Sequence, residues 1–132
     1  MGAGIAKIVK KEYPQAYEVD KALLAGDKNK LGYFSFAYIP EKCVTIFNLY
    51  AQVGIGNTGH PLQRNLKYDL LYDGMFRICE YLKENLYAGD RLVLAMPMLG
   101  AGLAGGEWEI IEKILESVES HFANIIFNVY KL

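Results

Sequence analysis

Apolar side chains recur every three or four positions in several stretches of the chain, which is the spacing of amphipathic helices. The stretch at residues 66–86 carries one such stripe: Leu71, Met75, Ile78 and Leu82. Pro14 ends one shorter helical stretch and starts a second, which Gly26 closes. The pattern predicts helices over residues 4–13, 15–25, 66–86 and, from Trp108, about 108–122.

Four shorter stretches are rich in β-branched, aromatic and other apolar residues, as strands are. They span residues 33–39, 43–51, 92–96 and 124–130, and Pro40 lies in the turn between the first two. Helices separate the other strands, and the chain shows neither a linker nor a repeat. We therefore expect one domain over residues 1–132, of the α/β class: a three-layer α/β/α sandwich around a mixed, mainly parallel sheet.

A glycine-rich segment at residues 97–108 reads Pro-Met-Leu-Gly-Ala-Gly-Leu-Ala-Gly-Gly-Glu-Trp and joins an expected strand to an expected helix. Glycines let the backbone turn tightly and approach a ligand closely. Backbone amides at such a loop and helix start form a cradle suited to phosphate. Alternatively, these glycines serve only a tight turn and contact no ligand. We expect ligand contacts from Leu99, Gly100, Ala101, Gly102, Leu103 and Ala104.

A second glycine segment, at residues 2–6, also opens an expected helix. Two such loops predict a ligand with more than one phosphate. Ligands of parallel sheets collect at the carboxyl ends of the strands, where the segment after Tyr50 would also lie. The expected contacts in the N-terminal segment are Gly2, Ala3, Gly4 and Ile5.

The composition and charge of the chain exclude some classes of binding partner. Apolar residues make up 52 % of the chain and charged residues 22 %, which is ordinary for an α/β domain. The formal net charge of −1 offers no basic face for duplex nucleic acid. No apolar run approaches the roughly twenty residues of a membrane span, and we expect no signal peptide. The sequence thus predicts a small-molecule ligand and leaves the oligomeric state open.

The two cysteines show no spacing typical of a metal site. Cys43 lies in an expected strand and Cys79 in an expected helix, so we expect two buried free thiols in a reducing cytosol. No other cluster of metal-ligating residues is visible in the sequence. The expectation is a cytoplasmic protein with no metal and no cofactor.

Four segments resemble, in order, those of macrodomains, the ADP-ribose-binding fold, and the resemblance covers the whole chain. Residues 1–6 are similar to the first ligand loop, and residues 97–108 to the second, phosphate-binding loop. Asn-Leu-Tyr-Ala-Gln at residues 48–52 resembles the Asn-Leu-Tyr-Thr-Gln segment of one macrodomain branch, with Ala51 replacing threonine. Lys-Tyr-Asp at residues 67–69 resembles the Arg-Tyr-Asp that starts its following helix.

That branch contains ADP-ribose-1″-phosphate phosphatases and hydrolases that remove ADP-ribose from glutamate or DNA. The resemblance implies ADP-ribose or its 1″-phosphate as the ligand, with Asn48 and Tyr50 among its contacts. The hydrolases carry a lysine at the place of Gln52 and an aspartate at that of Ala104. Glutamine cannot form the covalent adduct that a lysine amine can, and alanine offers no carboxylate. The pattern therefore resembles the phosphatases, with Gln52 and Glu107 as catalytic candidates.

These candidates also have structural interpretations. Asn48 and Gln52 could end a strand by hydrogen-bonding to their neighbours, and the helix dipole favours Glu107 at a helix start. Two functions stay open. One is a phosphatase in which loop amides stabilise the phosphoryl group while Gln52 or Glu107 positions water. The other is a module that binds ADP-ribose, or a related nucleotide signal, without turnover.

Macrodomains carry a strand, a helix and another strand before the first glycine loop, whereas this chain begins inside that loop. The resemblance implies that the strand leading into Gly2 would lie between the strands ending at Ala51 and Met96. Unpaired buried backbone groups are costly there. We expect direct pairing of those two strands, an edge borrowed from a partner chain, or a natural start upstream of Met1, which we favour.

Overall fold

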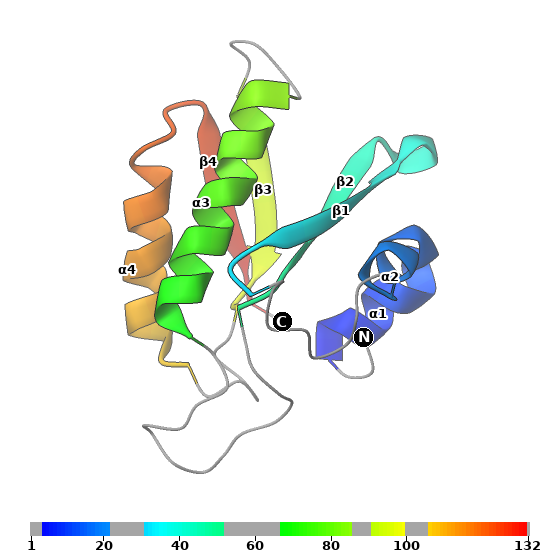
Figure 1. The fold of residues 1–132 in the computed structure, drawn as a ribbon, viewed down its shortest axis with the longest axis horizontal. Helices are drawn as coiled ribbons and strands as arrows, with labels where there is room; N and C mark the ends of the chain where they lie inside the picture. Colours follow the sequence, from blue (N-terminus) through cyan, green and yellow to red (C-terminus); the bar gives the residue numbers. More distant parts are fainter. Residues whose placement is uncertain (1–3, 22–30, 52–66, 86–90, 100–105, 132) are drawn as a thin grey trace.

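The computed structural model of this chain describes residues 4–21, 31–51, 67–85, 91–99 and 106–131, and gives no side-chain placement for residues 4–6. Helices and strands alternate through most of the chain, as expected (Figure 1). In chain order the elements are α1 (Gly4–Glu12), α2 (Pro14–Lys21), β1 (Phe34–Ile39), the 3-10 helix η2 (Pro40–Lys42), β2 (Val44–Leu49), α3 (Tyr68–Asn85), β3 (Leu92–Pro97), α4 (Trp108–Glu119) and β4 (Ile125–Tyr130).

The expected elements are all present, with ends that differ by a few residues. The second helix is described only as far as Lys21, so its expected end at residue 25 lies outside the described residues. The last helix ends at Glu119 rather than at residue 122, and Phe122 is buried in the turn that follows it.

Strands β1 and β2 form an antiparallel pair in the register Phe34↔Leu49 to Ile39↔Val44. The alternation of side chains along β1 divides the pair into two faces. Ala37 and Ile39 are buried against Ala16 of α2. On the other face, the Phe34 and Phe47 rings lie edge-on to Tyr81 of α3, at centroid distances of 5.7 and 6.2 Å. This pair is therefore covered by helices on both faces.

Strands β3 and β4 form a parallel pair in the register Leu92↔Ile125 to Pro97↔Tyr130. Leu94 and Met96 of β3 pack into the main core, whereas Val93, the residue before Leu94, is 59 % exposed. Ile126, the register partner of Val93, is also exposed. Helices α3 and α4 thus cover one face of the pair (Figure 1). The other face carries exposed apolar side chains.

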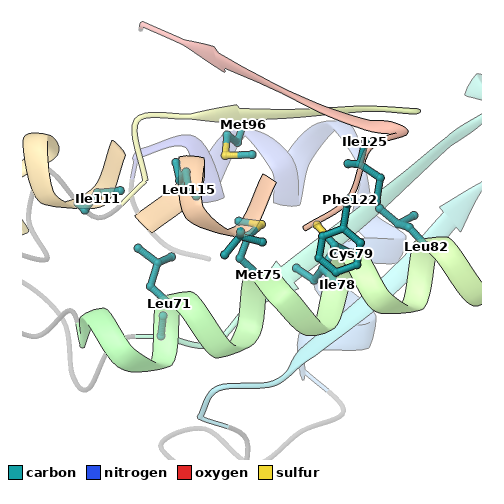
Figure 2. Packing of buried hydrophobic residues seen from close by; sticks show 12 residues of the cluster. Leu71, Met75, Ile78, Cys79, Leu82, Met96, Ile111, Leu115, Phe122 and Ile125 are labelled. Carbon is teal, nitrogen blue, oxygen red and sulfur yellow. The ribbon is translucent and has the colours of Figure 1, made fainter. Parts of the chain in front are cut away.

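The main core lies between α3, α4 and the parallel pair, and Figure 2 shows its side chains closing the space between these elements. The stripe predicted on residues 66–86 is buried as expected. The core residues are Ala51, Leu71, Met75, Ile78, Cys79, Leu82, Met96, Ile111, Leu115, Val118, Phe122 and Ile125.

Among the described residues the strands form two separate two-stranded sheets, β1–β2 and β3–β4. Direct pairing of the strands ending at Ala51 and Met96, one of the three alternatives given above, is therefore not found among the described residues. The carboxyl ends of β2 and β3 nevertheless lie at the same end of the molecule as the first turns of α3 and α4 (Figure 1). That end is where ligands of α/β folds bind.

The prediction for Cys43 is wrong, because this residue lies in the turn between β1 and β2 and is exposed. Its backbone has a φ of 52°, and its amide donates a hydrogen bond of 3.3 Å to the carbonyl of Pro40. The one-turn 3-10 helix at Pro40–Lys42 has to end in a left-handed residue so that β2 can run back along β1. Cys79 is buried, as expected.

Candidate functional site

At the end of the molecule where β2 and β3 finish, hydrogen bonds connect the end of β2, the start of α3 and the start of α4. The first of these bonds joins β2 to α3. Ala51 directly follows the β2 end and is buried in the main core. Its carbonyl accepts a hydrogen bond of 2.8 Å from the amide of Lys67, the residue before α3. The two ends of the segment at residues 52–66, which begins with the candidate Gln52, are therefore held together.

The second link joins α3 to α4. The hydroxyl of Tyr68, the first residue of α3, accepts a hydrogen bond of 3.0 Å from the backbone amide of Glu107. The Glu107 carbonyl in turn accepts from the amides of Ile110 and Ile111, at 3.1 and 3.0 Å, and so opens α4. The end of the glycine-rich segment is thereby fixed to the start of α3.

Glu107 and Leu99 are the two described candidates that flank the glycines. Glu107 is the N-cap of α4, in an extended conformation, and its exposed side chain makes no capping hydrogen bond. Leu99 is half-buried and packs against the main core beyond the end of β3. One end of the segment is thus held by apolar packing and the other by the Tyr68 hydroxyl, which leaves the Glu107 carboxylate in solvent.

The side chains of Asn48 and Tyr50 belong to a polar cluster between β1, β2 and α2. The Tyr50 hydroxyl donates to the Asp20 carboxylate at 2.8 Å and lies 2.7 Å from Ser35 Oγ. The Asn48 amide donates both to Ser35 Oγ and to the Ala16 carbonyl, at 3.1 Å each. These bonds match the structural interpretation of Asn48, a strand end that hydrogen-bonds to its neighbours.

Within this cluster the environment of Tyr50 disfavours the phenolate. Burial, together with the hydrogen bond to Asp20 and the charge of that carboxylate, raises the pKa of Tyr50 to about 12, although the Ser35 hydrogen bond acts the other way. The folded protein therefore holds the Tyr50 proton more tightly than the unfolded chain does. Its contribution to stability is complete below pH 10 and is lost as the pH rises towards 12.

We expect the Tyr50→Phe variant to lose about 1 kcal/mol of stability near pH 7, because the hydroxyl makes two hydrogen bonds in a half-buried place. Between pH 10 and 12 its stability should fall less steeply than that of the wild type. Urea unfolding across this pH range measures both effects, with Tyr130→Phe, at an exposed tyrosine, as the control. If the stability of the wild type and of Tyr50→Phe fell equally steeply with pH, the raised pKa of Tyr50 would be contradicted.

Most of the predicted ligand and catalytic residues lie outside the described residues. Gly4 is the first residue of α1, and Ile5 follows within that helix. The structure thus brings together the ends of two candidate segments, at residues 52–66 and 97–108, rather than the candidates' side chains. The candidates outside the described residues are Gly2, Ala3, Gln52, Gly100, Ala101, Gly102, Leu103 and Ala104.

Sequence reasoning missed the polar cluster and the bond between Tyr68 and Glu107. One signal was present: Ser35 is a polar residue on the same strand face as Ala37 and Ile39, which predicts a partner for its hydroxyl. The residues paired by the Tyr68 hydroxyl are 39 positions apart, and no local pattern reveals such a contact.

The described part of the chain contains neither a candidate metal site nor a candidate membrane span. No group of three or more histidine, cysteine, aspartate or glutamate side chains there could hold a metal ion. None of its helices is long and apolar enough to cross a membrane.

The fold has counterparts among solved structures. A protein of unknown function from Bacteroides thetaiotaomicron superimposes with a TM-score of 0.79 at 22 % identity, over 98 % of this chain and 78 % of that one. The macrodomain of DarG from Mycobacterium tuberculosis superimposes with a TM-score of 0.73 at 20 % identity, over 98 % of this chain and 80 % of that one. The chain therefore has the α/β fold of macrodomains.

Sequence comparison gives the family. The chain is 33 % identical over 129 residues to the uncharacterized 17.5 kDa protein in the tk-vs intergenic region of Enterobacteria phage T4, covering 96 % of this chain and 77 % of that protein. It belongs to the family of this phage protein. No protein-family model matches the chain.

Proposed function

We propose that the chain binds ADP-ribose and hydrolyses ADP-ribose 1″-phosphate to ADP-ribose and inorganic phosphate. The observation that carries the proposal is the pair of hydrogen bonds at the start of α3, from the Lys67 amide to the Ala51 carbonyl and from the Glu107 amide to the Tyr68 hydroxyl. In a macrodomain fold, these bonds hold the residues that flank 52–66 and the end of the glycine-rich segment at residues 97–108 near the carboxyl ends of the strands. The partner is accordingly a small molecule.

In this mechanism the glycine segments at residues 2–6 and 97–108 bind the phosphates. Their backbone amides stabilise the negative charge of the transferring phosphoryl group. A water oxygen forms a bond to phosphorus as the bond from phosphorus to the 1″ oxygen breaks. One proton of the water passes to the 1″ oxygen, which the sugar keeps as a hydroxyl, and the other stays on the inorganic phosphate. Glu107, whose carboxylate is exposed beside the segment, or Gln52 orients the attacking water.

Binding without turnover is the second candidate function. It is favoured by the cluster around Asn48, whose amide donates both of its hydrogen bonds within the protein. With the Tyr50 hydroxyl bonded to Asp20, these two predicted contacts stabilise the packing of α2 on the strands.

Calorimetric titration with ADP-ribose and measurement of phosphate release from ADP-ribose 1″-phosphate separate these functions. The phosphatase proposal expects binding, together with release that falls at least tenfold in Gln52→Ala or Glu107→Gln, since positioning water contributes at least this much. Binding without release would establish the second function, and no binding would refute both. We also expect no ADP-ribose release from modified glutamate or DNA, because residues 52 and 104 are glutamine and alanine.

A further inference from the structure

We propose that Tyr68 is a positioning residue of the phosphate-binding segment: its hydroxyl holds the first amide of α4 in place before the ligand arrives. This inference rests on the proposed function and deepens it. The ligand class is that of phosphate-bearing nucleotides, probed with ADP-ribose. The acting atoms are the Tyr68 hydroxyl oxygen, as acceptor, and the Glu107 backbone nitrogen, as donor, 3.0 Å apart.

The place of Tyr68 makes it suitable for this role. Its ring packs against the main core, and it is the first residue of α3, whose preceding residue Lys67 is bonded to Ala51. Both the ring and the backbone are therefore held by contacts other than the hydrogen bond of the hydroxyl. The hydroxyl is an anchor on a rigid support, as a preorganised site requires.

The donor, the backbone amide of Glu107, is by contrast not held by other hydrogen bonds of its own helix. Glu107 lacks a side-chain cap, and an N-cap amide has no acceptor within its helix. It directly follows Gly106, the last glycine of the segment. Without the Tyr68 hydroxyl, water would satisfy this exposed amide, and the first turn of α4 would adopt its binding geometry for a smaller share of the time.

The size of the effect follows from the free energy of one hydrogen bond. A net contribution of about 0.5–1.5 kcal/mol corresponds to a competent population reduced by about two- to tenfold. The apparent Kd rises by the same factor when only that population binds. The bond lies at an exposed place, so the thermal stability of the whole domain should change little.

The test compares Tyr68→Phe with Tyr81→Phe, which removes a hydroxyl from the same helix while its ring stays in the aromatic cluster. In Tyr68→Phe we expect faster hydrogen exchange of the Glu107 amide, a Kd for ADP-ribose raised about two- to tenfold, and a nearly unchanged Tm. Tyr81→Phe should retain both the exchange rate and the Kd. A purely structural role would instead raise exchange throughout α4 and lower Tm.

A second comparison tests the same hydrogen bond from its donor, and its two single variants do not depend on the folding of Tyr68→Phe: the Kd for ADP-ribose should be higher in Glu107→Pro than in Glu107→Ala. Glu107→Pro removes the donor, whereas Glu107→Ala keeps it. Adding Tyr68→Phe should weaken binding in the alanine background and change nothing in the proline background. Equal Kd values for the wild type and Tyr68→Phe would overturn the positioning role. If the wild type binds no ADP-ribose, the proposed function fails, and the exchange rate of Glu107 still tests the hydrogen bond.

Discussion

Replacing Gly102 by valine is expected to abolish ADP-ribose binding while the protein stays folded. Gly102 lies between Leu99, which packs on the core, and Glu107, which Tyr68 holds. The new methyl groups would occupy the space in which the proposed pyrophosphate approaches the backbone.

Calorimetry gives the affinity of Gly102→Val, and circular dichroism with a thermal scan shows whether it is folded. Ala123→Val adds a comparable branched side chain at an exposed turn after α4 and should bind like the wild type. If Gly102→Val is folded and its affinity for ADP-ribose is unchanged, the pyrophosphate does not bind at the glycine-rich segment.

Replacing Ile111 by alanine should cause one of the largest losses of stability that a single truncation in this chain can produce. Ile111 has no exposed surface and fills the core between α4 and α3 (Figure 2). Truncating such a side chain removes its hydrophobic transfer energy and leaves a cavity. The expected loss in the free energy of unfolding is about 2–5 kcal/mol, a large part of what a domain of this size has.

The neighbouring residue supplies the matched control. Ile110 is 38 % exposed, so Ile110→Ala makes the same chemical change on the same helix and should cost less than about 1 kcal/mol. Urea unfolding of both variants gives the two values. Similar losses in the two variants would show that the face of α4 that carries Ile111 does not pack in the core.

Much of the fold was predictable because its elements carry strong periodic patterns. The stripe from Leu71 to Leu82 needs only helical geometry to form one face, and that face is buried. The apolar runs of β3 and β4 likewise predicted strands, and the intervening helix predicted that they would be parallel. Local spacing determines each of these features.

Other features depend on contacts between residues far apart in the sequence. No spacing shows that the Asn48 amide would meet the Ala16 carbonyl, or that Tyr68 would reach Glu107. Cys43 was misplaced because it directly precedes the strand pattern that begins at Val44, whereas in the structure it ends the 3-10 helix after Pro40 in a left-handed conformation. The candidate site was therefore predictable as a set of segments, and its hydrogen-bonded framework was not.

The unequal placement of the two thiols gives the experimenter a natural labelling site. Burial raises the pKa of Cys79 to about 12, with a smaller contribution from the charge of Glu119, so at neutral pH this thiol is both shielded and protonated. Cys43 stands exposed at the tip of the hairpin, away from the first turns of α3 and α4 (Figure 1). A maleimide dye attached there would report on ligand titrations without occupying the candidate site and without any engineered cysteine.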